Sequence, residues 1–177
     1  MESAAPCARC EAAIRAGGHM IVRFFAALAA LPLLTMEVPA YAQIVADPEM
    51  VANVMRDAGY RAEVDELESG IPFIQSSSGG LPFRVFFYGC DDGGQNCKTI
   101  QLYAGFITDN SPTLTEMNAY NRDNRFGRVY IDNEDDPVIE MDIDLEDGGM
   151  SAALLEDNLE YWAYIMGRFS EFAFSKD

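Results

Sequence analysis

The chain has 177 residues, a length typical of one domain or of two small ones. Its 12 Lys and Arg are outnumbered by 29 Asp and Glu, which gives a formal net charge of −17. This balance argues against binding to nucleic acid or to an anionic membrane surface, because both need clustered basic side chains. Hydrophobic residues make up 49% of the chain, which is enough for a core and argues against a disordered protein.

Residues 20–42 have the pattern of an export signal. A basic start at Met20–Arg23 precedes an apolar run over 24–34, which is too short to span a bilayer. Ala40-Tyr41-Ala42 then matches the small-x-small cleavage pattern. We therefore expect cleavage after Ala42 and a mature domain over residues 43–177, located in the periplasm or secreted.

Residues 1–19 precede this signal, and Met20 is an alternative start of the protein. They hold Cys7, Cys10 and His19, but one CxxC pair is a weak signal for a zinc or thioredoxin-like site. We interpret them as a misassigned or dispensable extension. Residues 1–42 contain three basic and three acidic residues, so residues 43–177 carry the whole net charge, with 9 basic and 26 acidic residues.

The first half of the mature domain predicts one helix and four strands. Asp47-Pro48 is a typical helix start and Gly59 a typical end, which predicts a helix over 48–58. Two short extended segments follow at 61–67 and 73–77. The β-branched and aromatic segments 83–89 and 98–107 predict a hairpin at the centre of a sheet.

Cys90 and Cys97 lie at the two ends of the turn-rich loop of this hairpin. In an exported protein, such a pair predicts a disulfide, and two free thiols are the alternative. On the loop-closure model, so short a loop gives roughly 2.5 kcal/mol of stabilisation.

The second half predicts a helix, a second hairpin and a long last helix. The middle helix begins at Ser111-Pro112 or at the capping box of 113–116 and ends near Asn124. Strands at 128–132 and 138–145 have one core face and one solvent face, in a register that places Arg128 opposite Asp142. An apolar stripe predicts a helix over about 151–172 that covers the sheet. The result is a single α+β domain, with a mostly antiparallel sheet of about five to six strands and three helices.

The mature domain lacks the usual catalytic groups. It has no histidine, which excludes Ser-His, Cys-His and His-metal schemes, and it has no GxGxxG, P-loop or GxSxG motif. We therefore expect no catalytic residue and no cofactor.

The carboxylates between residues 132 and 146 allow a different interpretation. Asp132, Asp135, Asp142 and Asp144 are candidates for a divalent-cation site or for the acid pair of a carboxylate-based hydrolase. A calcium loop starting at Asp142 fails, because Asp147 stands where glycine is needed and the twelfth position is not Glu. The alternative is the solvent face of a half-buried strand and its turn, which we favour.

A second candidate surface lies where the middle helix meets the following strand. Amides, an aromatic ring and arginines gather there, which suits binding of an anionic ligand. The alternative, which we favour, is that the amides cap the helix and the arginines pair with nearby acids. The candidate residues are Asn118, Tyr120, Asn121, Arg125 and Arg128.

Several segments in this order resemble the YbjN family, in its exported branch. The resemblance rests on Phe86–Cys90, Cys97, Leu102–Phe106, Asn118–Asn121, Arg125–Asp132, Asp157–Leu159 and Trp162. It implies an α+β domain similar to type III secretion chaperones, described as a sensory transduction regulator and often dimeric. The family has no agreed catalytic residues.

We therefore expect a non-enzymatic, exported regulatory module that acts by protein–protein interaction, with an unidentified protein partner or as a homodimer. No nucleic acid is expected as a partner, and no membrane after signal cleavage. A cation-binding protein or carboxylate-based hydrolase that uses the acidic region is the alternative hypothesis.

Overall fold

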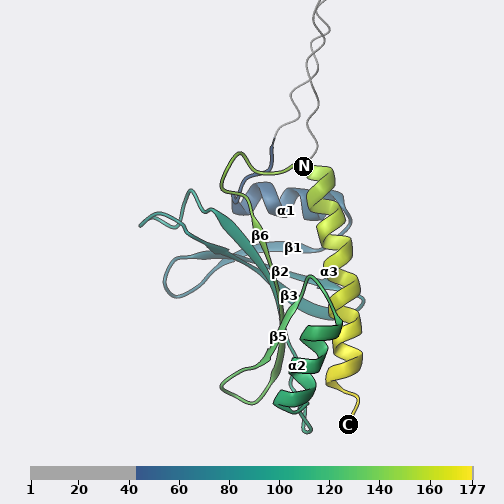
Figure 1. Cartoon of the computed structure of the whole chain (residues 1–177). Coiled ribbons are helices and arrows are strands. Elements are labelled where there is room, and N and C mark those ends of the chain that lie inside the picture. The colour runs from purple at the N-terminus through teal and green to yellow at the C-terminus, as the bar shows by residue number, and fades with distance from the viewer. Residues whose placement is uncertain (1–42, 177) are drawn as a thin grey trace, which may run out of the picture. The chain divides into compact units, whose positions relative to one another are not determined.

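The computed structural model describes residues 43–176, which form the predicted single α+β domain with a six-stranded antiparallel sheet and three helices (Figure 1). The strand order is β1-β2-β3-β4-β6-β5. The predicted leader and extension, with Cys7, Cys10 and His19, lie outside the described residues. The elements are α1 (Pro48–Asp57), β1 (Ala62–Glu66), β2 (Pro72–Ser78), β3 (Leu81–Tyr88), β4 (Thr99–Gly105), α2 (Leu114–Asp123), β5 (Arg128–Ile131), β6 (Pro137–Asp144) and α3 (Ala152–Ala173).

The helices lie on one face of the sheet, and within residues 43–176 the other face carries no helix (Figure 1). Val85, Leu102 and Ile139 point from the strands into the core, where Trp162 and Phe169 of α3 are fully buried. The apolar stripe predicted for the last helix is confirmed. Its buried members are Leu155, Leu159, Trp162, Ile165, Met166 and Phe169.

Both short helices begin at the caps that the sequence predicted. The Asp47 carboxylate accepts a hydrogen bond from the backbone N–H of Met50 at 2.8 Å, and Gly59 follows the helix with φ of +87°. Thr113 and Glu116 form the capping box of α2. These local contacts satisfy backbone N–H groups that have no partner within the helix.

The predicted disulfide between Cys90 and Cys97 is present. It closes a loop in which the Asp91 carboxylate accepts hydrogen bonds from the backbone N–H groups of Gly93 and Gln95. The bond from Gln95 is the main reason that the pKa of Asp91 lies below its usual value. Cys97 is buried in the core cluster, so the disulfide anchors the loop to the body of the domain.

An unpredicted bridge joins the start of the described chain to the segment before α3. Ile44 and Met150 exchange two backbone hydrogen bonds, at 2.7 and 3.0 Å. Gly149 permits this approach, because its φ is +72° and a Cβ there would lie 2.1 Å from the backbone oxygen of Ile44. Any other residue at this position would collide with the bridge.

The register of the β5-β6 hairpin differs from the prediction by two residues. Arg128 lies opposite Glu140 and not opposite Asp142. The Asp132 carboxylate accepts hydrogen bonds from the backbone N–H groups two and four residues ahead, at 2.9 and 3.0 Å. These bonds close the loop at residues 132–136, so that Ile131 lies opposite Pro137 and the turn is centred one residue earlier than the predicted register requires.

Candidate functional site on the helix-free face of the sheet

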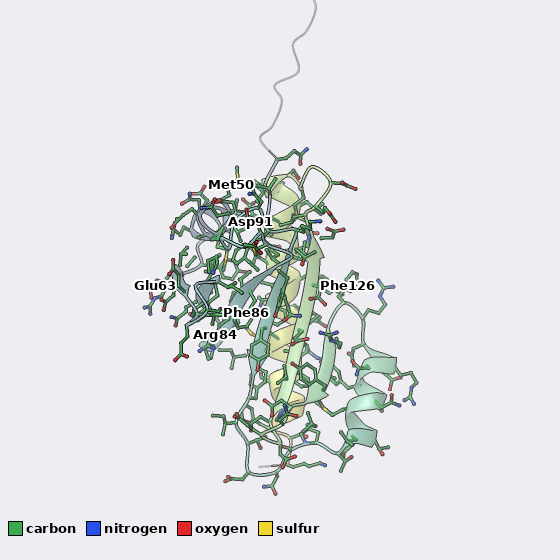
Figure 2. All side chains as sticks on the ribbon, turned by 90° about the vertical axis from the view of Figure 1, so that its left-hand side faces the viewer. Met50, Glu63, Arg84, Phe86, Asp91 and Phe126 are labelled. Atoms are coloured by element: carbon green, nitrogen blue, oxygen red, sulfur yellow. A yellow bond between two sulfur atoms is a disulfide. The ribbon has the colours of Figure 1, made fainter. Side chains whose placement is uncertain are left out.

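A row of polar and aromatic side chains crosses the helix-free face of the sheet. Gln75, Arg84, Tyr103, Glu140 and Arg128 are successive partners on β2, β3, β4, β6 and β5. Direct partners on one face of a sheet have their Cβ atoms about 5 Å apart, so these side chains are neighbours. Figure 2 faces this side and shows Arg84 near Phe86.

Three aromatic rings form a continuous band on this face, which we call the aromatic band. The ring centroids of Phe73 and Phe86 are 6.0 Å apart, and those of Phe86 and Tyr103 are 5.6 Å apart. The Arg84 guanidinium lies 5.5 Å from the Phe73 ring centroid. Phe73 is buried although no helix of the described chain covers this face, and it lies outside the main core cluster. The band is therefore a second, smaller apolar layer.

Glu140 is the least expected residue of the site. Its side chain is only 7% exposed, although the alternation of β6 predicted a solvent-facing carboxylate. It accepts a hydrogen bond from the Tyr130 hydroxyl at 2.6 Å and pairs with Arg128. Flanking side chains bury it, because Tyr103 and Arg128 are its direct neighbours in the sheet. The prediction that this face of β6 is fully in solvent is wrong at Glu140.

Both tyrosines beside Glu140 are neutral phenols at neutral pH. Burial and then the hydrogen bond to Glu140 raise the pKa of Tyr130. Burial, followed by the negative charges of Asp132 and Glu140, raises the pKa of Tyr103. The group therefore combines one buried carboxylate with hydroxyl donors and a guanidinium, which suits binding better than proton transfer.

A buried amide extends this polar network along the face. Gln101 donates a hydrogen bond to Asp142 at 2.8 Å and accepts one from the Tyr88 hydroxyl at 3.2 Å. Because all three residues are on neighbouring strands, the network holds the side chains of β3, β4 and β6 in one arrangement.

A groove of about 470 Å³ continues the face beyond the aromatic band. Arg84 and Tyr103 line one part of it, and Asp132 and Asp136 line another. Ile107, which is 86% exposed, also lines the groove. The face therefore leads from apolar rings to a group of carboxylates.

The structure gathers only part of the predicted acidic set. Carboxylate oxygens of Asp132, Glu134 and Asp136 lie within 4.8 Å of one another, an arrangement of hard oxygen ligands that a divalent cation accepts. Asp135 is not a member of this group. Asp142 and Asp144 lie farther along β6, about 20 Å or more from the loop at 3.3 Å per residue. The negative charge is thus spread along the sheet and not concentrated at one end.

The structure also divides the predicted interaction surface. Tyr120 is partly buried and packs against Phe169 and Phe172, with ring centroids 5.3 and 4.8 Å apart, at the edge of the core. Asn118 is exposed on α2. Arg128 lies on the helix-free face beside Glu140.

Asn121 and Arg125 have different environments again. The Asn121 side chain donates to the backbone oxygen of Val129 at 2.8 Å and accepts from its N–H at 2.9 Å, which fastens α2 to β5. Arg125 lies over the ring of Phe126, at 5.1 Å from its centroid. The five predicted residues therefore do not form one surface.

The aromatic band was not predicted from the sequence. The signal was present in 81–88, where Phe86 alternates in phase with Arg84 and Tyr88 and out of phase with the core residues Phe83 and Val85. An aromatic ring on the polar phase of a strand indicates a face that is apolar without being core.

A larger cavity, of about 790 Å³, lies elsewhere, between the cysteine loop and the start of α1. Lys98 lines it but is paired with Glu146 at 2.5 Å. We therefore place the candidate site on the helix-free face, where the aromatic band and a buried carboxylate occur together.

In residues 43–176, no helix has the length and apolar character needed to cross a membrane.

No curated protein and no solved structure matches the chain. A family model described as "YbjN: Putative bacterial sensory transduction regulator" matches residues 47–174. The chain belongs to the YbjN family.

Proposed function

We propose that this YbjN-family chain is an exported, non-enzymatic regulatory module that binds a basic protein through the helix-free face of its sheet. The observation that carries the proposal is the aromatic band of Phe73, Phe86 and Tyr103, which no helix of the described chain covers. Phe86 and Tyr103 are partly exposed, whereas Phe73 is buried beside them. Partly exposed aromatic rings with a polar surround are typical of a protein interface.

Charge supports a basic partner over a second copy of the chain. Residues 43–177 hold 26 acidic and 9 basic residues, so two copies would repel each other at any shared face. Glu63 and Asp65 border the face on β1, and Asp132 and Asp136 border it at the groove. A partner segment with an apolar anchor and flanking Lys or Arg is complementary to this pattern.

Two features support export. The pattern of residues 20–42 is that of a cleaved leader, and Cys90 and Cys97 form the disulfide that an oxidising compartment allows. The absence of histidine from residues 43–177 supports a role other than catalysis, as does the Glu140 carboxylate, which already bonds Tyr130 and Arg128.

Site-specific photocrosslinking in the native host tests the proposal. A photoreactive phenylalanine analogue replaces Phe86 on the helix-free face or, as the matched control, the exposed Phe126 away from it (Figure 2). We expect an adduct with one basic protein from position 86 and not from position 126. Binding of a basic protein through this face would be refuted if position 86 gives no adduct, or gives adducts only with this chain or with acidic proteins. N-terminal sequencing of the same material tests cleavage after Ala42.

A second candidate function is divalent-cation binding by Asp132, Glu134 and Asp136, which the closeness of their oxygens favours. A ligand that binds only the folded state raises its melting temperature. We expect calcium at millimolar concentration to raise the melting temperature of the wild type and not of Glu134→Gln. Identical melting curves with calcium and with chelator would exclude this candidate.

A further inference from the structure

Three arginines of the described chain have no carboxylate partner. Residues 43–176 contain nine Lys and Arg, and six of them form ion pairs at 4.0 Å or less. The remaining three are Arg84, Arg125 and Arg168. In so acidic a protein, unpaired guanidinium groups are unexpected, because residues 43–177 hold 26 acidic residues against 9 basic ones.

Two of these three arginines line the same pocket. Arg125, from the segment after α2, and Arg168, on α3, border a pocket of about 200 Å³ on the helical side of the domain. Asp123 is its only acidic lining residue, and both of its oxygens are held by Arg122 at 2.8 Å. The positive charge of Arg168 also reaches the pocket's Tyr120, whose pKa it lowers against the larger effect of burial.

Aromatic rings lie in and beside this pocket, next to a residue with a strained backbone. Phe126 has φ of +72° and its side chain is 55% exposed, an unfavourable combination for a bulky residue. Its ring centroid lies 4.5 Å from that of Tyr161, which lines the pocket. The Arg125 guanidinium lies over the Phe126 ring, 5.1 Å from its centroid. Tyr164, another lining residue, is also exposed.

From this geometry we infer that the pocket binds a small molecule through one oxyanion, a carboxylate or a phosphate, held by Arg125 and Arg168. Guanidinium groups bind both oxyanions with paired, charge-assisted hydrogen bonds. The apolar part of the molecule packs on Phe126 and Tyr161. The pocket is smaller than the roughly 300 Å³ of ordinary ligand sites, so it accepts a head group with a small ring and excludes a nucleotide.

Calorimetry with the full chain tests this site, with phenyl phosphate and benzoate as probes and sodium chloride at matched ionic strength as the blank. We expect at least one probe to bind the wild type, and the better probe identifies the oxyanion. Arg125→Gln and Arg168→Gln each weaken binding by about tenfold or more, since each removes charged hydrogen bonds. Arg84→Gln is the matched control, because it removes the third unpaired guanidinium, from the opposite face.

Amide chemical shifts locate the bound probe independently. We expect shift changes at Arg125–Gly127 and Tyr161–Arg168. Without probe, the two arginine variants should keep the melting temperature of the wild type, because both arginines are exposed. The inference would be overturned if neither probe binds at about 10 mM, a concentration that detects affinities in the millimolar range. Equal losses in Arg84→Gln and Arg168→Gln would also overturn it, because they indicate a general charge effect. Neither result bears on crosslinking from position 86.

Discussion

Replacing Asn121 with Ala should loosen the attachment of α2 to the sheet. The side chain makes two hydrogen bonds with the backbone of Val129, at 2.8 and 2.9 Å. Val129 is buried, so both of its backbone groups lose a partner that water replaces poorly. At about 1 to 1.5 kcal/mol for each bond, we expect the free energy of unfolding to fall by roughly 2 to 3 kcal/mol. With an m-value of about 2 kcal/mol/M, the loss of these bonds alone lowers the urea midpoint by about 1 to 1.5 M, which is the difference expected from a control with the same helix propensity.

Asn118→Ala is the matched control for this experiment. Asn118 is an exposed asparagine on the same helix, so both substitutions gain the same helix propensity, about 0.5 kcal/mol. Its midpoint should stay equal to that of the wild type or rise slightly. Midpoints of the two variants within about 0.25 M of each other would contradict the role assigned to Asn121.

Three further changes test other contacts. Reducing the Cys90–Cys97 disulfide should lower the free energy of unfolding by about 2.5 kcal/mol, since the closed loop is short. The pKa of Glu116 is lowered to about 2, first of all by its hydrogen bond with the Lys176 ammonium. The ionised carboxylate therefore stabilises the fold above its ordinary pKa of 4.5, and this stabilisation is lost as the pH falls toward 2. Glu116→Gln should therefore flatten the acid limb of the stability curve. Gly149→Ala should cost about 2 kcal/mol or more, because its Cβ would lie 2.1 Å from a backbone oxygen.

Each of these predictions has its own control. The stability of the variant with serine at both cysteines should not change with reductant. An unchanged urea midpoint on reduction of the wild type would contradict a stabilising role of the disulfide. Parallel acid curves for the wild type and Glu116→Gln contradict the pKa argument. Gly148 also has positive φ but has nothing within 4 Å of its added Cβ, so Gly148→Ala should cost clearly less than Gly149→Ala in chemical denaturation.

The fold was predictable because its signals are local. Caps at Asp47 and Thr113 and the apolar stripe around Trp162 each depend on residues a few positions apart. The β5-β6 register was not, because two side-chain hydrogen bonds of Asp132 decide where the loop closes. The Ile44–Met150 bridge joins distant segments that carry no pattern for it.

The candidate site was less predictable than the fold. Glu140 alternates with core residues as a solvent-exposed acid would, and only its neighbours on β4 and β5 make it buried. Arg125 was a candidate for binding an anionic ligand, with pairing to nearby acids as the favoured alternative, but Arg168, which shares its pocket, is 43 positions later in the chain. A single strand or helix pattern carries no information about which residues of other elements lie beside it.

The bonds from Asn121 to Val129 also occupy backbone groups on the outermost strand of one border of the sheet. At the opposite border, Arg56 of α1 donates to the backbone oxygen of Ala62, and β1 carries three carboxylates among its five residues. These bonds and charges protect part of each border from pairing with the strand of another molecule. They oppose the edge-to-edge growth by which exposed strands assemble into fibres.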